Sequence, residues 1–286
     1  MANICIVTHS LGNGGAQRSS ALLSITLKDI GHNPFIVCME NQFDYGHCGE
    51  VLHLYQHVKS NMFTRKFNKF IALRKFLKEN NITAVVENRT RNNFINELVF
   101  RYFVYRSIHI IYTVRNYNLE KSFPKNRLLA KLLYAGASRI VCVSNEVENH
   151  VKATYNLKNT LCIYNTFVEE AINPVKIEKQ PFIFTYGRIV EEQKNFTLLF
   201  NAFFTSKLWE KGIKLIVMGK GNDLEMLKNL CKDNNISQVE FLDYNPAPWN
   251  YVKNAHFVAL TSRYEGFGRV LLESLSYGTP VVSVDC

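Results

Sequence analysis

The last 24 residues of the sequence contain two glutamates and a glycine-rich turn, which are features that can bind a polar ligand. Glu265 and Glu273 stand eight positions apart in the stretch RYEGFGRVLLESLSYGTPVVSVDC. The turn between them contains Gly266, Phe267 and Gly268. Carboxylates accept hydrogen bonds from hydroxyl groups, and consecutive backbone N–H groups in a turn bind anions. The other interpretation is a helix entrance with one surface glutamate.

The spacing of the two carboxylates limits the chemistry that they can perform. A helix that begins at about residue 266 separates them by about 12 Å along its axis, because each residue rises about 1.5 Å. The carboxyl groups of a retaining glycoside hydrolase lie only about 5 Å apart, so a hydrolytic pair is disfavoured. The separation instead suits an elongated ligand with hydroxyl groups at both ends and a diphosphate between them, such as a nucleotide sugar.

Two cations upstream have the charge that a diphosphate requires. Arg188 and Lys194 lie in YGRIVEEQKNF, where Arg188 leaves a predicted strand and Lys194 stands at the start of the next predicted helix. Each charge-assisted hydrogen bond from such a cation contributes about 1.5–3 kcal/mol. A solvated basic pair is the alternative for this stretch taken alone.

Two further glycine turns follow predicted strands. Gly14 and Gly15 open a helix in HSLGNGGAQR, where the backbone can approach a phosphate or a sugar. Gln17 stands where a dinucleotide-binding fingerprint requires a third glycine, so NAD is disfavoured, and a purely structural turn stays open. The second turn, in MGKGND, suits a nucleobase or is a plain tight turn, and Asp223 is expected to serve the following helix start.

Short apolar runs alternate with longer amphipathic stretches along the whole chain. Eleven strands are predicted at 3–9, 34–39, 82–88, 108–114, 139–144, 160–165, 181–187, 213–219, 239–243, 256–262 and 279–285. Helices are predicted between most of them, at 16–29, 65–79, 124–136, 194–207, 222–234 and 265–277. This alternation predicts an α/β protein with parallel sheets, and the irregular segment 165–181 divides it into two Rossmann-like domains, 1–165 and 166–286.

Composition restricts the class of protein and its partners. Seven scattered cysteines with no C-x-x-C pair argue against a disulfide framework or a zinc site and favour the reducing cytoplasm. The net charge of +10 indicates an anionic partner. Nucleic acid is disfavoured because the basic residues are dispersed and form no known binding motif. No apolar run approaches the roughly 20 residues of a spanning helix.

Residues 62–78, MFTRKFNKFIALRKFLK, interleave phenylalanines with basic residues. Phe63, Phe67, Phe70 and Leu77 fall near one face of the predicted helix. The basic residues are Arg65, Lys66, Lys69, Arg74, Lys75 and Lys78. Such a helix can lie on an anionic membrane leaflet. The alternative is that it packs its apolar face on the sheet and keeps the cations outside.

With these stretches in order, the chain resembles glycosyltransferase family 4, retaining enzymes of the GT-B fold, from residue 3 to residue 285. The stretch with Glu265 and Glu273 matches the E-x7-E signature of that family. The segments GNGGAQR, VCVSNEV, YGRIVEEQKNF and LIVMGKG fall where the family has matching segments. The resemblance implies two domains that face a central cleft. It also implies about 60–80 further residues, so the second domain is expected to be incomplete.

The resemblance also implies roles for the candidate residues. Glu265 is expected against the donor sugar as a catalytic residue, and Glu273 on the ribose hydroxyls. Arg188 and Lys194 are also expected to be catalytic residues, on the diphosphate and without a metal or a cofactor. The donor-site residues of the N-terminal domain would be Gly14, Gly15 and Arg115. Arg115 stands where many relatives have a histidine. Gly266, Phe267 and Gly268 would contact the donor from the C-terminal domain.

The activity implied is transfer of a hexose or N-acetylhexosamine from a UDP-sugar to a glycan acceptor, expected to be lipid-linked. The setting implied is surface polysaccharide, capsule or lipopolysaccharide biosynthesis, in the cytoplasm or peripherally on the inner face of the cytoplasmic membrane. Two alternatives stay open: an inactive nucleotide-sugar-binding fragment, and an NDP-sugar epimerase of the same fold.

Overall fold

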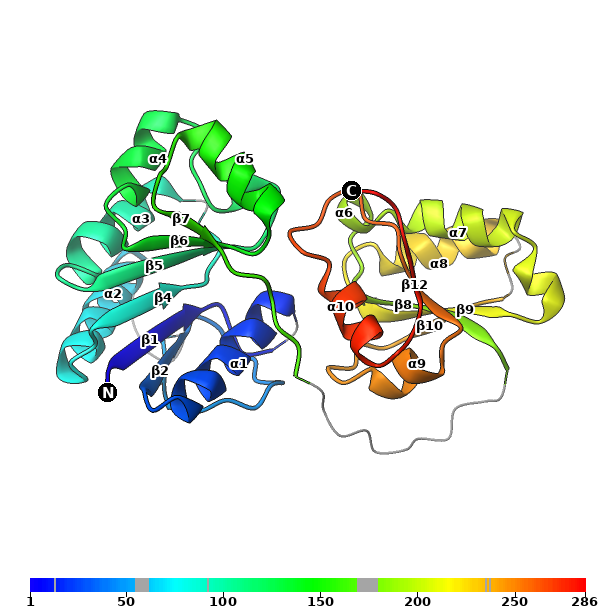
Figure 1. Ribbon diagram of the computed structural model, residues 1–286, viewed down its shortest axis with the longest axis horizontal. Helices are drawn as coiled ribbons and strands as arrows, with labels where there is room; N and C mark the ends of the chain where they lie inside the picture. Colours follow the sequence, from blue (N-terminus) through cyan, green and yellow to red (C-terminus); the bar gives the residue numbers. More distant parts are fainter. Residues whose placement is uncertain (13, 55–61, 92, 169–179, 235, 237) are drawn as a thin grey trace. The chain divides into compact units, whose positions relative to one another are not determined.

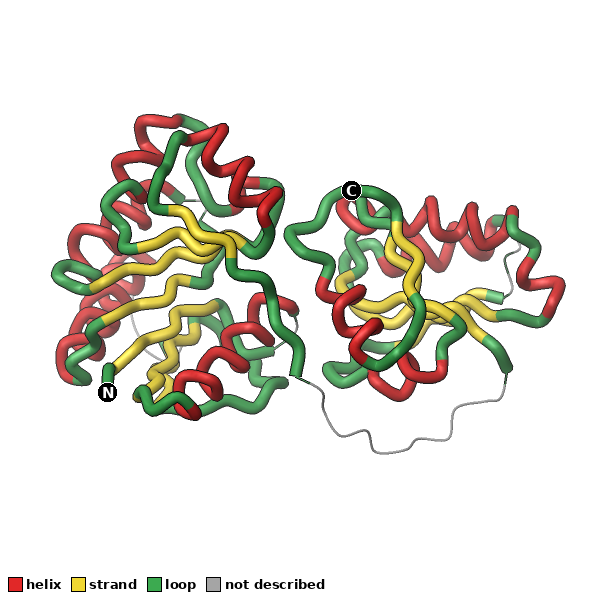
Figure 2. The backbone as a smooth tube through the Cα atoms, viewed as in Figure 1, coloured by secondary structure: helices red, strands yellow, loops and turns green. Residues whose placement is uncertain are grey.

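The computed structural model describes residues 1–286 apart from 13, 55–61, 92, 169–179, 235 and 237, with the backbone alone at 62–66. It contains two compact units, Met1–Asn165 and Thr166–Cys286 (Figure 1). Each unit is a parallel β-sheet covered by helices (Figure 2). The predicted α/β class is confirmed.

The first unit contains a seven-stranded sheet in the order β3-β2-β1-β4-β5-β6-β7. Its strands are β1 (Asn3–Thr8), β2 (Asn33–Cys38), β3 (Glu50–His53), β4 (Ala84–Glu87), β5 (His109–Val114), β6 (Arg139–Cys142) and β7 (Thr160–Cys162). Its helical segments are α1 (Gly15–Asp29), α2 (Met62–Glu79), α3 (Phe94–Val99), the π-helical turn η1 (Phe100–Val104), η2 (Leu119–Lys121), α4 (Arg127–Tyr134) and α5 (Asn145–Tyr155).

The second unit contains a five-stranded sheet in the order β10-β9-β8-β11-β12. Its strands are β8 (Phe182–Arg188), β9 (Lys214–Lys220), β10 (Val239–Leu242), β11 (Phe257–Leu260) and β12 (Val281–Ser283). Its helical segments are α6 (Glu191–Lys194), α7 (Phe196–Thr205), η3 (Leu208–Lys211), α8 (Leu224–Asp233), α9 (Trp249–Asn254) and α10 (Arg269–Ser276).

Burial explains why the apolar runs form central strands. Cys5, Ile6 and Val7 of β1 are fully buried, as expected for a parallel strand with helices on both faces. In the second unit, Phe196 and Phe200 of α7 lie in the apolar cluster on one face of the sheet, and Trp249 of α9 in the cluster on the other. The sheet of the second unit therefore has an apolar layer on each face.

Helix ends follow from local side chains. Asn126 accepts hydrogen bonds from the N–H groups of Leu128 and Leu129 and so caps α4. Ser144 caps α5 through the N–H of Val147. Asparagine and serine supply the acceptor that the first turn of a helix otherwise lacks.

All eleven predicted strands are present, but β3 was not predicted. Its sequence, EVLH, is four residues long with polar ends and lies at the sheet edge, so it has no continuous apolar run. Helix α2 confirms the predicted helix at 65–79. Its apolar side is mixed, since Leu77 is buried in the core whereas Phe67 is exposed. The side chain of Phe63 lies outside the described residues.

Candidate active site

The charged residues predicted in the second unit gather where the order of its strands reverses. In the sheet, β8 lies between β9 and β11. Along the chain, three helical segments separate β8 from β9, and more elements separate β8 from β11. Arg188 ends β8, and Glu265 lies in the loop 261–268 that follows β11. Ligands of doubly wound sheets bind beyond the carboxyl ends of strands at such a reversal. The topology therefore places both residues at the expected ligand edge.

Lys194 and Glu265 form a direct ion pair. The Lys194 Nζ atom lies 2.6 Å from Glu265 Oε1, and each side chain is less than one-fifth exposed. The Ser262 hydroxyl donates a hydrogen bond of 2.7 Å to the same oxygen. The prediction put Lys194 at the start of a helix, which is wrong, because Lys194 is the last residue of the short helix α6. The ammonium group therefore faces the loop after β11.

Contacts between backbone and side chains hold the α6 turn against the loop after β11. The Thr261 hydroxyl donates to the carbonyl oxygens of Lys194 and Asn195, both at 3.1 Å. The Arg263 guanidinium donates to the Glu191 carbonyl at 2.7 Å and to Asn195 Oδ1 at 2.8 Å. Asn195 has the left-handed conformation with φ 52°, which asparagine tolerates better than most residues. These contacts fix Lys194 beside Glu265.

Glu273 lies on α10 and is 5% exposed. Its Oε1 accepts hydrogen bonds from Arg269 at 3.2 and 3.3 Å, and its Oε2 accepts one from the Tyr186 hydroxyl at 3.0 Å. Tyr186 belongs to β8, two residues before Arg188. A carboxylate has about four lone-pair positions, so these bonds orient the group and leave acceptor capacity.

The glycine turn precedes α10 rather than lying inside it. Helix α10 begins at Arg269, not at about residue 266, so Glu265 is four residues before the helix. The helical rise therefore does not set the distance between Glu265 and Glu273. Gly268 has φ 67°, a left-handed conformation that favours glycine, and no side chain caps the helix.

The glycines of MGKGND are required by the close approach of two backbones. A Cβ on Gly219 would lie 1.9 Å from the Gly187 carbonyl oxygen, and one on Gly221 would lie 1.8 Å from that of Ile189. This observation favours the tight-turn interpretation. Asp223 was expected to serve the start of α8, but its side chain does not cap that helix. It instead accepts a hydrogen bond of 2.7 Å from the Glu191 N–H at the start of α6.

In the first unit, the predicted glycines open α1. Gly14 precedes the helix with φ 149°, and its N–H donates to the Tyr45 hydroxyl at 3.4 Å. Gly15 is the first residue of α1. A Cβ on Gly14 would lie 2.6 Å from Oε1 at the end of the flexible Gln17 side chain, so the backbone conformation restricts this position more than space does.

Arg115 follows β5 and is held by two amides. Its Nε donates to Asn88 Oδ1 at 2.6 Å, and its Nη1 donates to Asn165 Oδ1 at 2.9 Å. Asn88 follows β4 and donates in turn to the Ser20 hydroxyl of α1 at 2.6 Å. Arg115 and the start of α1 are thus joined through Asn88 at the carboxyl edge of the first sheet.

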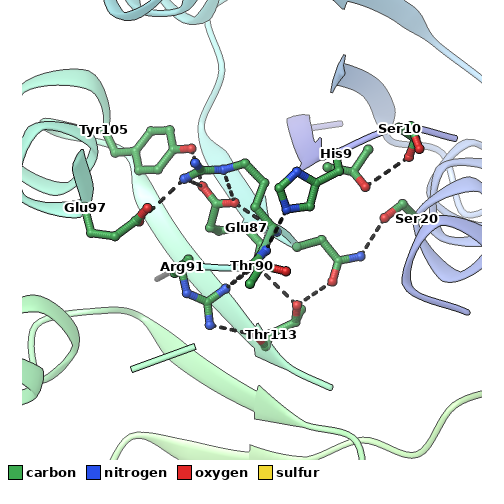
Figure 3. A network of polar contacts seen from close by, with 12 residues as sticks. His9, Ser10, Ser20, Glu87, Thr90, Arg91, Glu97, Tyr105 and Thr113 are labelled. Carbon is green, nitrogen blue, oxygen red and sulfur yellow. Dashed lines mark hydrogen bonds and ion pairs between the residues drawn. The ribbon is translucent and has the colours of Figure 1, made fainter. Parts of the chain in front are cut away.

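Beside Asn88 lies a buried ionic network that sequence reasoning missed (Figure 3). Arg89 makes two bonds of 2.8 Å to the two oxygens of Glu87 and lies 3.5 Å from Glu97. The Tyr105 hydroxyl donates to Glu87 at 2.5 Å. Arg91, 2% exposed, donates to the Thr113 carbonyl at 2.9 Å. The run ENRTRNN after a buried strand was the available signal.

Burial and the arginines have opposite effects on this network. Burial alone would raise the pKa of Glu87, but the adjacent Arg89 guanidinium outweighs it and holds that pKa below its usual range. Burial raises the pKa of Glu97 to about 7, because its contact with Arg89 is longer. Burial and Arg89 lower the pKa of His9, whose Nε2 accepts from the Thr90 N–H at 3.1 Å.

Among the residues that the structure describes, no three His, Cys, Asp or Glu side chains are grouped so that they could hold a metal ion. No described helix is both long and apolar enough to cross a membrane.

Comparison with known proteins defines the family. The sequence profile described as Glycosyltransferase Family 4 matches residues 13–168, more than half of the chain. The profile described as Glycosyl transferases group 1 matches residues 167–286. The chain therefore belongs to glycosyltransferase family 4, as the E-x7-E stretch indicated.

Two bacterial glycosyltransferases are among the relatives of this chain. The chain is 28% identical, over its whole length and 81% of the relative, to the N-acetylgalactosamine-N,N'-diacetylbacillosaminyl-diphospho-undecaprenol 4-alpha-N-acetylgalactosaminyltransferase of Campylobacter jejuni. It is 31% identical to the lipopolysaccharide 1,6-galactosyltransferase of Salmonella typhimurium, over 51% of the chain and 42% of that relative. The alignment thus spans less than half of the Salmonella protein.

Solved structures show the same fold at low identity. TarM of S. aureus, in a structure that contains UDP, superposes with a TM-score of 0.77 at 12% identity and covers 100% of this chain and 86% of its own. HepE of Anabaena, in complex with UDP-glucose, gives 0.71 at 18% identity and covers 99% and 80%. The predicted GT-B fold is confirmed.

Proposed function

We propose that this glycosyltransferase transfers a hexose or N-acetylhexosamine from a UDP-sugar, with retention, to a lipid-linked glycan acceptor. The observation that most favours it is the Lys194–Glu265 ion pair at the strand reversal, with Arg188 at the end of β8. The UDP-bound structures of TarM and HepE favour UDP as the donor nucleotide. The Campylobacter relative, which is named for a diphospho-undecaprenol acceptor, favours a lipid-linked one.

The transfer breaks the bond between the anomeric carbon and a diphosphate oxygen and forms a bond to the acceptor hydroxyl oxygen, which loses its proton. UDP leaves with additional negative charge. We assign Arg188 and Lys194 to that charge, because preorganised cations stabilise charge that develops in the transition state. Glu265 holds the Lys194 ammonium and lies beside the donor sugar. With two cations in place, the transfer requires no metal ion.

We assign Glu273 to the ribose hydroxyls, with Arg269 and Tyr186 holding its carboxylate. Gly266, Phe267 and Gly268 present their backbone to the diphosphate. For the first unit taken by itself, we propose that Gly14, Gly15 and Arg115 line a ligand-binding edge of its sheet. The name of the Salmonella relative favours lipopolysaccharide assembly as the setting. We extend the proposal to other surface polysaccharides, including capsule, and to the cytoplasmic side of the membrane.

Thermal unfolding with and without UDP tests the nucleotide site first. UDP at one hundred times its dissociation constant should stabilise the folded chain by about 2.7 kcal/mol. Labelled UDP-sugars are then incubated with a polyprenyl-diphosphate-linked sugar, with and without EDTA. Transfer of label to the lipid in both samples is expected. UDP binding without transfer would instead indicate a nucleotide-sugar-binding protein, and a changed donor without acceptor would indicate an epimerase.

A further inference from the structure

The net positive charge of this protein comes from one segment of the first unit. Residues 62–139 contain 16 of the 34 lysines and arginines but only 4 of the 24 aspartates and glutamates. Their formal net charge is therefore +12, and that of the rest of the chain is −2. The overall charge of +10 is thus a property of this segment and not of a uniformly basic surface.

Three helical elements of this segment are neighbours. Phe70 of α2 packs edge-on against Phe100 of η1 with ring centroids 5.1 Å apart, and the Arg74 guanidinium lies 4.5 Å from the Phe103 ring centroid. On the other side of η1, the Tyr102 hydroxyl donates to the Leu132 carbonyl of α4 at 2.8 Å. α2, η1 and α4 therefore form a continuous layer.

Large apolar side chains are exposed along this layer. We call it the basic–apolar surface and define its apolar part as Phe67, Ile71, Tyr102, Phe103, Leu128 and Leu132. Leu128 and Leu132 are 75% and 52% exposed and stand four residues apart, so they lie on one face of α4. The cations of these elements that are exposed or half-buried are Lys69, Arg74, Lys75, Lys78, Arg101, Arg127 and Lys131.

Helix stability does not explain the position of Arg127. It is the first residue of α4, which has no acidic residue in its first turn. A cation there opposes the helix dipole. Arg127 is followed directly by the exposed Leu128, the arrangement of a helix whose apolar face enters a bilayer while its cations meet anionic headgroups.

We infer that the basic–apolar surface docks on an anionic lipid bilayer. The inference rests on the proposed function, because a lipid-linked acceptor is presented at such a bilayer. It differs from the sequence-based expectation in location: α2 buries Leu73, Phe76 and Leu77, so the docking residues come from its exposed side together with η1 and α4. Seven exposed or half-buried cations next to exposed leucines complement an anionic, apolar phase.

Vesicle co-sedimentation of the full chain, without donor or acceptor, tests the docking independently of the transfer reaction. The vesicles are phosphatidylcholine alone or phosphatidylcholine mixed with phosphatidylglycerol. Binding to the mixed vesicles is expected, with a loss as salt rises, because screening weakens the attraction. Equal binding to both vesicle types, or no binding to either, would overturn the inference. Binding to RNA in preference to the mixed vesicles would also overturn it.

Paired variants locate the contact. The double variant Leu128→Ser/Leu132→Ser should bind mixed vesicles at least about tenfold more weakly. The double variant Arg127→Gln/Lys131→Gln should lose about fivefold for each cation. The matched controls on the end of α1 are Ile30→Ser and Lys28→Gln, both at exposed positions. Controls that weaken binding as much as the test variants would refute the assignment of this surface.

The donor-site measurements separate the two proposals. If the surface variants lose vesicle binding but keep the thermal shift with UDP, docking and nucleotide binding are distinct, as inferred. If vesicles bind normally and UDP causes no shift, the proposed function fails while the docking surface stands.

Discussion

Replacing Glu273 by glutamine is expected to remove recognition of the ribose hydroxyls and to keep the rest of the nucleotide site. Alanine is the poorer choice, because it would remove both acceptor oxygens from beside Arg269 and Tyr186, and a largely buried donor left without its acceptor costs stability. Glutamine preserves the shape and one acceptor oxygen for Tyr186 and Arg269. It removes the charge that strengthens hydrogen bonds from a ribose.

The magnitude follows from the kinds of hydrogen bond exchanged. A hydrogen bond to a charged group contributes about 1.5–3 kcal/mol and a neutral one about 0.5–1.5 kcal/mol. For one or two ribose hydroxyls, Glu273→Gln should therefore weaken UDP binding by about 1–3 kcal/mol, or about 5- to 150-fold in Kd. Tyr186→Phe removes one bond that holds Oε2 and should have a smaller effect, about 2- to 10-fold.

Isothermal titration with UDP and with its dideoxy analogue, which lacks both ribose hydroxyls, isolates this effect. The wild type should bind UDP more tightly than the analogue. In Glu273→Gln and Tyr186→Phe, this difference in Kd should become smaller, while the Kd for the analogue stays nearly constant. Tyr251→Phe is a matched control, because Tyr251 also stacks on Phe184 but does not contact Glu273 through any hydrogen bond found among the described residues. If Glu273→Gln keeps the full preference for UDP, the ribose assignment is wrong; if only Tyr186→Phe keeps it, Tyr186 does not position the carboxylate.

Three further outcomes are expected. Glu265→Gln should lower the rate of sugar transfer by about 10²–10³ with UDP affinity nearly kept, measured by initial rates and titration, and loss of UDP binding would show that its role is misplaced. Gly219→Ala should destabilise the fold by more than about 2 kcal/mol in urea unfolding, since its Cβ would meet a backbone oxygen at 1.9 Å, whereas Gly212→Ala has open space and should cost only about 1 kcal/mol for its φ of 73°. The pKa of Glu97 is raised to about 7 in the folded protein, so the folded state binds this proton more tightly than the unfolded state, and the stability from this group is lost as pH rises from about 4.5 to 7. The free energy of unfolding in urea, measured against pH, should therefore fall more steeply for the wild type than for Glu97→Gln over this range. Parallel pH dependences of the two proteins would contradict the expectation.

The strands were predictable because burial on both faces imposes continuous apolar runs. β1, β5 and β8 are such runs, and the ends of β5 and β8 placed Arg115 and Arg188 at the carboxyl edges of the two sheets. The edge strand β3 was missed because it needs no apolar run. The start of α10 was misplaced because Gly268, and not a side-chain cap, sets it.

The pairing within the site was not predictable from sequence. Lys194 and Glu265 are 71 residues apart, and only the adjacency of β8 and β11 brings their side chains together. The same holds for Tyr186 and Glu273, 87 residues apart. The residue types in the sequence were sufficient to predict the candidate site residues. The contacts between those residues depend on the order of strands in the sheet.

The ionic network behind Asn88 has an evolutionary consequence. Loss of one charged partner leaves another buried without compensation, whereas joint replacement by apolar residues of similar volume is often neutral. Positions 87, 89, 97 and 105 are therefore linked: single changes are selected against, and the four are expected to change together among relatives. A lineage that loses this network should lose it in one concerted set of substitutions, and the loop that orients Arg115 would then need a different support.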